Sequence, residues 1–400
     1  MPGMTSDVDI LIAGGGVAGL TAAAAFGTAG FSVLCVDPTP PVTDADSEGS
    51  DLRTTALLQP SRELLERAGL WDRLAPFAAD LKVMRIVDAS GPELVTRAFD
   101  AADLRDDLPF GWNLPNWLLR REILARIEEM DHVTLRSGVA FAGLTARSEA
   151  ALVRLSDGTR VSARCLLGAD GRDSAVRAAL GIGVRTFRYG QKAITFAVTH
   201  AAPHDNVSTE VHRSGGPFTL VPLPDHDGQP CSAVVWMDRG EDVARLAALD
   251  EATFEAEATE RSAGLFGDLR LVSRRMVWPI ISRFADAMSG PRTALMAEAA
   301  HVVPPIGAQG LNMSLADLGC LLDLARSRPE DLGSPRMLDR YARRRHPEVM
   351  VRVAGIDALN RTSMTALRPL QSLRAKGIEA LYGITPVRRG LMKLGLGANA

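Results

Sequence analysis

Three glycines near the N-terminus have the spacing of a site for a dinucleotide pyrophosphate. Gly14, Gly16 and Gly19 form the pattern Gly-x-Gly-x-x-Gly. In this pattern the first glycine permits a tight turn, the second lets the backbone approach the pyrophosphate, and the third lets a helix pack closely on a strand. Unpaired N–H groups at the start of that helix attract phosphate oxygens. We therefore expect this turn, including Val17 and Ala18, to bind a dinucleotide.

The residues around these glycines fit a strand–turn–helix–strand unit. Residues 7–13 form an apolar run typical of a buried parallel strand, residues 20–26 favour a helix, and residues 31–36 favour a second strand. Asp37 follows that strand, where a carboxylate can accept hydrogen bonds from a ribose. The unit fits FAD and NAD equally well. Its alternative interpretation is a glycine-rich turn that binds no nucleotide.

A second segment places an acid after an expected strand. Residues 160–168 read as another buried strand, and Asp170 follows it in a turn. Ser174 can then cap a short helix. Taken alone, an Asp-Gly pair is more often just a turn than a functional site.

A third segment joins an acid to a rigid loop. Residues 293–301 look like a strand that ends in an acid, Glu298. Residues 304–312, which we call the Pro-Pro loop, contain two prolines and two glycines and can pass close to a planar ligand. We expect a helix from about residue 312 to residue 325, whose first N–H groups point at whatever the loop holds.

Length and composition indicate a globular protein of two domains. The chain has 400 residues, of which 46% are hydrophobic and 23% charged, and this excludes a disordered or fibrous chain. A net charge of −3 argues against nucleic-acid binding. The four cysteines are scattered, so we expect no disulfides and a reducing, cytoplasmic location. We see neither a signal peptide nor a run of roughly 18 apolar residues that could span a membrane.

The middle of the chain has the alternation of β-strands. We expect residues 190–240 to form an antiparallel sheet. Phe218 and Trp236 could line an aromatic pocket, but strand aromatics usually belong to a core, which is the interpretation we favour. The histidines between residues 200 and 226 match no ligand spacing, so we expect no metal. We expect His301 to be a packed residue and not a catalytic base.

Together, the three motifs resemble the FAD-dependent aromatic hydroxylases, the p-hydroxybenzoate hydroxylase-like family. They are the glycine pattern, the Leu-Gly-Ala-Asp-Gly segment at residues 167–171, and the Glu-Ala-Ala-His segment with the Pro-Pro loop at residues 298–312. Further segments resemble the branch that hydroxylates ubiquinone precursors: residues 51–57, 216–223, 232–236 and 370–395. The resemblance spans nearly the whole chain.

The resemblance implies roles in binding FAD for residues along the chain. Asp37 would bind the adenosine ribose, Arg53 the phosphates, and Asp170 both FAD and the reduced nicotinamide. Pro305 and Gly307 would border the flavin face where oxygen adds, and we assign them to catalysis. The other cofactor-binding residues that it implies are Asn116, Arg120, Glu298, Gly310, Leu311 and Asn312. The main-chain N–H groups of the last two would donate to the flavin C2 carbonyl.

Two residues depart from the family pattern. The family usually has Gly-Asp before Ala-Ala-His, whereas this chain has Ala297 and Glu298. The longer Glu298 should still reach a ribityl hydroxyl, and Ala297 needs slightly more room than glycine.

The implied fold is α/β: a Rossmann-like FAD-binding domain of the GR2 type, interleaved with a β-sheet substrate domain and followed by C-terminal helices. The expected FAD-binding domain comprises residues 1–75, 105–185 and 285–335. Residues 76–104 and 186–284 would form the substrate domain, and residues 336–400 the C-terminal helical region.

The implied activity is monooxygenation of an aromatic ring. NAD(P)H reduces FAD, O2 adds at flavin C4a, and the ring takes the terminal oxygen of the hydroperoxide. The expected substrate is a hydrophobic aromatic molecule, a polyprenyl phenol on the route to ubiquinone. The sequence assigns no base to ionise the phenol.

Other activities share these motifs. A hydroxylase of a small polar aromatic or a secondary metabolite would be favoured by a buried arginine at the end of the substrate pocket. A flavin-dependent reductase or halogenase has the same FAD site, but the halogenase signature is represented only by Trp278-Pro-Ile. A non-catalytic protein that binds FAD or a prenyl chain could also reuse the fold.

The C-terminal region is strongly basic. Residues 335–400 carry 13 Lys or Arg against four Asp or Glu, which makes this region +9 and the remainder −12. Leucine and isoleucine recur at helical spacing from residue 367 to residue 384. One interpretation is a solvated helix packed on the FAD domain. The other is a surface that meets anionic lipid at the inner face of the membrane, or other proteins of quinone biosynthesis.

Overall fold

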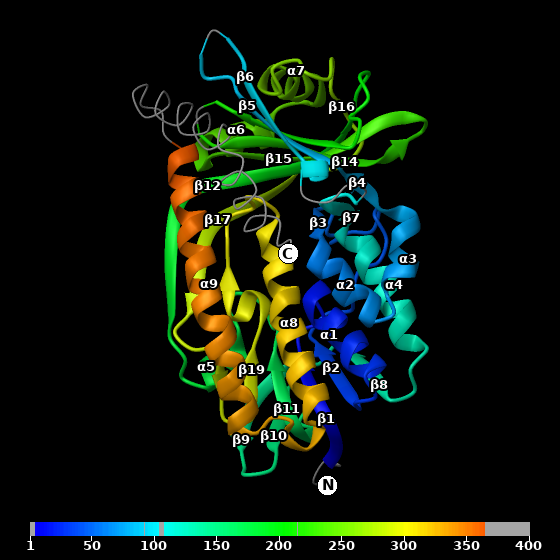
Figure 1. Cartoon of the computed structure of the whole chain (residues 1–400), viewed down its shortest axis with the longest axis vertical. Coiled ribbons are helices and arrows are strands. Elements are labelled where there is room, and N and C mark those ends of the chain that lie inside the picture. The colour runs from blue at the N-terminus through cyan, green and yellow to red at the C-terminus, as the bar shows by residue number, and fades with distance from the viewer. Residues whose placement is uncertain (1–4, 92, 104–107, 214, 365–400) are drawn as a thin grey trace.

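The structure is a computed structural model that describes residues 5–91, 93–103, 108–213 and 215–364. Within these residues the chain forms the expected α/β fold, with helices packed against sheets (Figure 1). One large sheet lies in the lower part of this view and most of the second lies in the upper part.

The first sheet is built around the N-terminal strand. β1 pairs in parallel with β2 on one side and with β11 on the other. The strand order is β18-β19-β11-β1-β2-β8, and β10 and β9 extend the sheet from β11. The strands are β1 (Thr5–Ala13), β2 (Val33–Asp37), β8 (Val133–Ser137), β9 (Phe141–Ala146), β10 (Ala151–Leu155), β11 (Arg160–Gly168), β18 (Ser289–Gly290) and β19 (Thr293–Leu295). The predicted strands at residues 7–13, 31–36 and 160–168 are confirmed.

Helix α1 (Val17–Thr28) packs in the interior beside this sheet. It is buried on all sides because it consists largely of small residues, and Ala22, Ala23 and Ala24 have no exposed surface. Such side chains let α4 and α8 approach it closely. The other helices around the first sheet are α2 (Gln59–Arg67), α3 (Trp71–Leu74), α4 (Asn116–Glu128), α5 (Ala175–Ala179), α8 (Gln309–Ser327) and α9 (Pro335–Ser363).

The second sheet is mainly antiparallel, as the alternation in residues 190–240 predicts. Its order is β20-β17-β12-β15-β14-β13-β5-β6, with β16 beside β12, and only β13 and β5 pair in parallel among its described strands. The strands are β5 (Val83–Asp88), β6 (Val95–Asp100), β12 (Val184–Thr199), β13 (Val207–His212), β14 (Pro217–His226), β15 (Gln229–Arg239), β16 (Arg270–Leu271), β17 (Met276–Ala285) and β20 (His301–Val302).

One face of the second sheet carries an aromatic core. Helices α6 (Gly240–Ala248) and α7 (Glu251–Arg261) lie above this sheet in Figure 1. Phe218 and Trp236 pack edge to face, and Trp236 also contacts Phe254 of α7. These rings are at most 5% exposed, which confirms that the two strand aromatics belong to a core. The opposite face of the sheet is therefore the one left to line a cavity.

A small third sheet lies next to the second (Figure 1). It consists of β3 (Thr54–Leu58), β7 (Gly111–Pro115) and β4 (Ala79–Leu81), with β7 in the middle. The Asn113 side chain of β7 donates from Nδ2 to the Pro222 carbonyl of β14 at 2.9 Å. This bond ties the small sheet to the second sheet.

The segment before the Pro-Pro loop differs from its expected form. The strand ends at Leu295, and Glu298 lies in a short 3₁₀ helix (Ala297–Ala299) instead of in a strand. The reason is that Ala297 has φ +54°, a left-handed conformation that turns the chain out of the sheet. Helix α8 begins at Gln309, three residues before the expected start, so the Pro-Pro loop includes its first turn.

The domain boundaries stay a prediction. β5 and β6, which come from residues 76–104, pair with the second sheet, and this supports grouping them with residues 186–284. The proposed helical periodicity from residue 367 to residue 384 lies outside the described residues. In the part of the chain that is described, no helix has the length and apolar character needed to cross a membrane.

Candidate functional site

A cavity of about 770 Å³ extends from the glycine-rich β1–α1 turn to the second sheet. This volume is in the upper part of the range for ligand pockets, roughly 300–1,000 Å³. Segments far apart in the chain meet there: the β1–α1 turn, the start of β3, the turn after β11, the Pro-Pro loop, and the free face of β13, β14 and β15. All the predicted site residues except Asn312 line this cavity.

The β1–α1 turn has the geometry of a phosphate site. Gly14 has φ +112°, and a Cβ there would lie 2.2 Å from the Ala169 carbonyl oxygen. A Cβ on Gly19 would lie 1.9 Å from the Gly14 oxygen, whereas at Gly16 it would meet no atom within 4 Å. The backbone at Gly16 is thus open to the cavity, and no side chain caps α1 there. The first N–H groups of α1 are left for a phosphate.

Asp37 lies at the end of β2 beside this turn. Its Oδ2 accepts a hydrogen bond from the Gly15 N–H at 2.6 Å, and its Oδ1 accepts one from the Thr39 N–H at 2.9 Å. Oδ1 also accepts from the Thr39 hydroxyl at 2.9 Å, whereas Oδ2 has a further lone pair to which a ribose hydroxyl can donate. Asp37 therefore holds the turn in place, and its predicted contact with a ribose stays a prediction.

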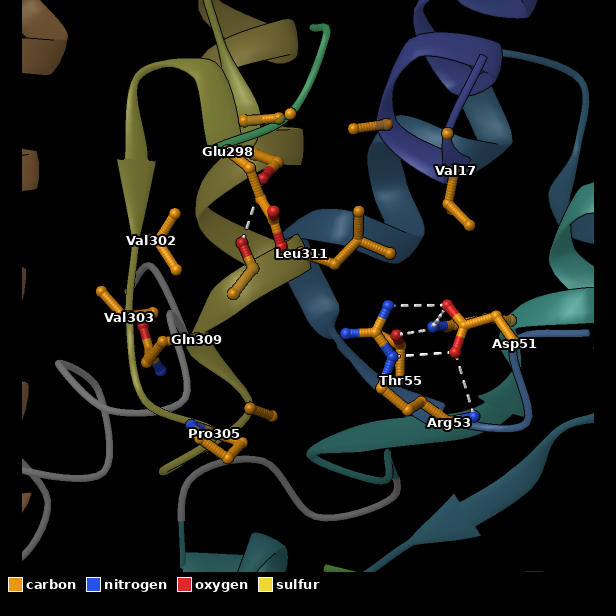
Figure 2. Close-up of a pocket in the computed structure, with 18 of the residues that line it drawn as sticks. Val17, Asp51, Arg53, Thr55, Glu298, Val302, Val303, Pro305, Gln309 and Leu311 are labelled. Atoms are coloured by element: carbon orange, nitrogen blue, oxygen red, sulfur yellow. Dashed lines mark hydrogen bonds and ion pairs between the residues drawn. The ribbon is translucent and has the colours of Figure 1, made fainter. Parts of the chain in front are cut away.

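Asp51 gathers a cationic cluster on the cavity wall (Figure 2). Arg53 donates to both of its oxygens, at 2.8 and 2.7 Å, and Asn116 Nδ2 donates to Oδ2 at 3.0 Å. Arg120 lies 4.0 Å from the same oxygen, and the Arg53 guanidinium stacks on Trp278 of β17. Two arginines against one carboxylate leave a net positive charge, which suits a phosphate.

The charge state of Asp51 follows from these partners. Burial acts to raise the pKa of its carboxyl, but hydrogen bonds and charge from Arg53, with smaller effects of Asn116 and Arg120, lower it overall. Sequence reasoning assigned Arg53, Asn116 and Arg120 but missed Asp51. The signal that could have found it is the Asp-x-Arg spacing, which lets the two side chains meet at the start of a strand.

Asp170 and Glu298 lie on the cavity wall with protein partners of their own. Asp170 accepts hydrogen bonds from the Ser174 hydroxyl and from the Val176 N–H, so it fixes the start of α5. Ser174 caps this helix as predicted. Glu298 accepts from Arg172 Nε at 3.3 Å. Their contacts with a cofactor stay predictions.

The Pro-Pro loop forms the opposite wall. In Figure 2, Pro305 and Gln309 lie across the open space from Asp51 and Arg53. Ala308 precedes α8 with φ +56°, and no side chain caps the helix. The first N–H groups of α8, including that of Leu311, therefore have no intrahelical partner. They can stabilise negative charge on a group bound against the loop.

Asn312 supports the loop from behind. Its Oδ1 accepts hydrogen bonds from the Leu58 N–H at 2.9 Å and from the Ser61 hydroxyl at 2.6 Å, and its Nδ2 donates to the Ala56 carbonyl at 2.8 Å. The side chain thus joins α8 to β3. Its predicted main-chain contact with a flavin stays a prediction.

A buried charged network lies behind the same loop. His301 Nε2 is 2.6 Å from Asp317 Oδ2, and Arg345 Nε of α9 donates to Asp317 Oδ1 at 2.8 Å. Burial acts to raise the pKa of Asp317, but His301 and Arg345 lower it overall. His301 is 2% exposed, so its prediction as a packed residue is confirmed. Asp317 and Arg345 were missed, because their pairing depends on how α8 and α9 pack.

The second sheet, together with β4 of the third sheet and Phe110 before β7, makes the far end of the cavity mainly apolar. Its apolar lining includes Leu81, Met84, Phe110, Val221 and Val235. The polar side chains at this end are Asn113, Ser208, Glu210 and Thr219. Among the described residues, the arginines that line the cavity are Arg53, Arg120 and Arg172, which lie before β3, in α4 and after β11, outside the second sheet.

Comparisons with known proteins match nearly the whole chain. The family described as FAD binding domain matches residues 7–354. A ubiquinone hydroxylase, UbiL, of Rhodospirillum rubrum is 33% identical over 97% of this chain and 89% of its own. A 3-demethoxyubiquinol 3-hydroxylase of Escherichia coli is 27% identical over 97% and 98%. The fold is similar to that of p-nitrophenol 4-monooxygenase PnpA from Pseudomonas putida, with a TM-score of 0.80, 19% identity, and coverage of 99% and 100%.

Proposed function

Because the chain belongs to the FAD binding domain family, we propose that the cavity holds FAD and that the protein hydroxylates an aromatic ring. The residues present fit this cofactor, since the open backbone at Gly16 and the cationic cluster around Asp51 face one cavity. The relatives named as ubiquinone hydroxylases support a polyprenyl phenol of ubiquinone biosynthesis as the substrate. When bound, FAD supplies the redox chemistry, taking hydride from NAD(P)H and activating O2 for transfer to the ring.

The chain itself binds, orients and shields the reactants. The β1–α1 turn and Asp37 hold the dinucleotide, with Arg53 and Arg120 near its phosphates. The N-terminus of α8 stabilises negative charge on the reduced cofactor. Pro305 and Gly307 present a wall without long side chains, so a ring can come close. The apolar end of the cavity excludes water from the reacting atoms.

The lining favours a hydrophobic phenol over a small aromatic acid. An aromatic carboxylate would need a cation at the substrate end, and no described lining residue there is an arginine or lysine. The acidic Glu210 lies at that end instead. We therefore retain the polyprenyl phenol as substrate class and do not favour a polar aromatic acid.

The observation that carries this proposal is that one cavity joins the dinucleotide turn to the apolar sheet face. The test is aerobic NADPH oxidation by the purified protein with and without a short-chain polyprenyl phenol, followed by the mass of the product. We expect faster oxidation and a product one oxygen heavier. If NADPH oxidation yields only peroxide with this and related phenols, the substrate assignment is wrong. If the purified protein is colourless and does not take up FAD, the assignment of the flavin site is wrong.

We further propose that the basic C-terminal region contacts an anionic membrane surface, where a polyprenyl substrate would be found. Five arginines of α9 already form ion pairs with acids: Arg336, Arg343, Arg345, Arg352 and Arg361. Residues 365–400 carry six Lys or Arg and a single acid, Glu379. The charge available to a membrane therefore lies mainly in this last segment.

A further inference from the structure

Strand β13 places a carboxylate on the apolar end of the cavity. Side chains of a strand alternate between its two faces. Thr209 and Val211 have no exposed surface, and Val211 packs in the aromatic core beneath α6 and α7. Ser208 and Glu210 line the cavity on the other face. Glu210 is only 8% exposed, so a ligand in this space would meet a carboxylate that is largely shielded from water.

The partners of Glu210 leave part of its carboxylate unoccupied. Oε1 lies 2.6 Å from Nε2 of His212, which is on the same face of β13. Its neighbours in the adjacent strands are Thr219 of β14 and Ile86 of β5. No hydrogen bond joins Oε2 to another described residue, and no arginine or lysine among them pairs with Glu210. Oε2 can therefore accept a hydrogen from a ligand.

His212 orients this carboxylate. Its Nδ1 is buried and has no hydrogen-bond partner among the described residues. With its proton on Nε2, the ring donates to Glu210, and Nδ1 is then a buried acceptor without a partner among the described residues. The contact holds Oε1 in place and leaves the other oxygen free.

A second acceptor on the same cavity points to the same kind of ligand. Asn113 of β7 is fully buried and lines the cavity. Its Nδ2 donates to the Pro222 carbonyl, but its Oδ1 has no partner in the described part of the chain. A buried acceptor without a partner is costly, and a ligand that donates a hydrogen bond removes that cost.

We propose that Glu210 is a catalytic residue that accepts the hydrogen bond of the substrate's ring hydroxyl and takes its proton during hydroxylation. This inference rests on the proposed function, and it assigns the base that the sequence left open. The two acceptors, Glu210 and Asn113, select a ring that donates hydrogen bonds over one that carries a carboxylate.

The timing of the proton transfer follows from acidity. A free phenol has a pKa of about 10, so a carboxylate does not ionise it in the resting complex. When a ring carbon bonds to the outer oxygen of activated O2, the O–O bond breaks, and its electron pair leaves with the other oxygen, which ends as water. Positive charge on the ring makes its hydroxyl a strong acid, so the O–H bond breaks, its electron pair forms a C=O bond, and the proton passes to Glu210, which later releases it to solvent. Loss of the proton from the hydroxylated carbon to solvent then restores the aromatic ring.

The test compares product formed per NADPH consumed in the wild type and in Glu210→Gln. Glutamine keeps the shape and an acceptor oxygen but cannot take the proton. We expect a fall of roughly 100-fold or more in product, with FAD still bound and NADPH consumed to give peroxide. Glu128→Gln, an exposed position at the end of α4, is the matched control and should leave the yield unchanged.

The outcomes separate this inference from the proposed function. If the wild type forms no hydroxylated product from any phenol, the proposed function fails. If the wild type does and Glu210→Gln matches it within about twofold, Glu210 is not the base. If Glu210→Gln does not fold with FAD, Glu210→Asp decides the question, because it keeps a carboxylate and should retain measurable product. The second substrate for this variant is the O-methyl ether of the phenol, which has no hydroxyl proton to lose. If folded Glu210→Asp hydroxylates this ether with the yield that the wild type gives with the phenol, the proposed role is overturned.

Discussion

At the cavity wall, Asp51 accepts hydrogen bonds from Arg53 and Asn116, and Arg120 lies within 4.0 Å of it. A carboxylate of this kind holds two guanidinium groups in one place, which long side chains would not maintain by themselves. The cluster is linked to the second sheet through the stacking of Arg53 on Trp278. Single residues here should therefore affect both the proposed binding of FAD and the contact of this segment with β17.

Replacing Arg53 tests this cluster. Arg53→Ala removes a guanidinium that we place near the FAD phosphates, and it should weaken FAD binding by about 10-fold to 100-fold in a protein that still folds. Titration of the apoprotein with FAD, followed by flavin fluorescence, measures the change. Arg67→Ala, which removes an arginine on α2 outside the cavity lining, serves as the control. Unchanged affinity in Arg53→Ala would refute the assignment.

Asp317 makes a residue-scale prediction about stability and pH. Asp317→Asn removes the buried anion shared by His301 and Arg345 and leaves Arg345 with the partly exposed Glu348 as its acidic partner, so the free energy of unfolding at neutral pH should fall by roughly 3–5 kcal/mol. The pKa of Asp317 is lowered in the folded protein, so its contribution is complete above the ordinary value of about 3.9 and is lost as the pH falls through the lowered pKa.

Urea denaturation of the wild type and of Asp317→Asn at a series of pH values measures how the contribution of Asp317 to stability depends on pH. The difference in stability between the wild type and Asp317→Asn should be largest at neutral pH and should shrink in acid. A difference that stays constant down to the lowest pH at which the wild type folds would show that the charge of Asp317 contributes nothing.

At the scale of elements, the sequence predicted those helices and strands that are specified by residues close together in the chain. The glycine spacing predicts β1, α1 and β2, because Gly19 packs against Gly14 within this one unit, whereas the contact of Gly14 with Ala169 after β11 has no signal in the spacing. The early end of β19 was missed because the left-handed conformation of Ala297 has no signal in an alanine. Glu210 was missed because its position on the cavity depends on the pairing of β13 with β5, which lies far earlier in the chain.

Helix α9 divides the expected C-terminal region, residues 336–400, into two parts whose removal should have different effects. Removing residues 336–400 deletes nearly all of a helix that buries Tyr341 and Arg345, whose bonds reach Leu295 and Asp317. That protein should be unstable. Removing residues 365–400 keeps α9 and should leave folding and FAD binding intact.

The shorter truncation tests the proposed membrane contact. Each basic residue near an anionic surface contributes about 1 kcal/mol, so losing residues 365–400 should weaken binding to anionic vesicles by at least about 10-fold. Sedimentation with anionic vesicles measures this, and neutral vesicles provide the control. Equal sedimentation of the truncated and full-length proteins would place the contact elsewhere.

At the scale of the whole molecule, the cavity exists because two sheets meet face to edge around the Pro-Pro loop. The carboxyl ends of β1, β2 and β11 bring Gly14, Asp37 and Asp170 to one side. The second sheet turns its aromatic face to α6 and α7 and its other face to the cavity. The motifs could predict the side of the cavity that contains Gly14, Asp37 and Asp170, since these residues lie in local sequence patterns. They could not predict the substrate end, because its lining comes from strands with ordinary alternation of apolar and polar residues.

The central claim is that this cavity transfers one atom of O2 to a phenolic ring, and the source of that atom tests it most directly. The purified protein with FAD, NADPH and a short-chain polyprenyl phenol would be supplied with isotopically heavy O2 in ordinary water. We predict a ring-hydroxylated product that carries one heavy oxygen atom. A hydroxylated product whose oxygen comes from water, or consumption of O2 with the phenol unchanged and only peroxide formed, would contradict the account.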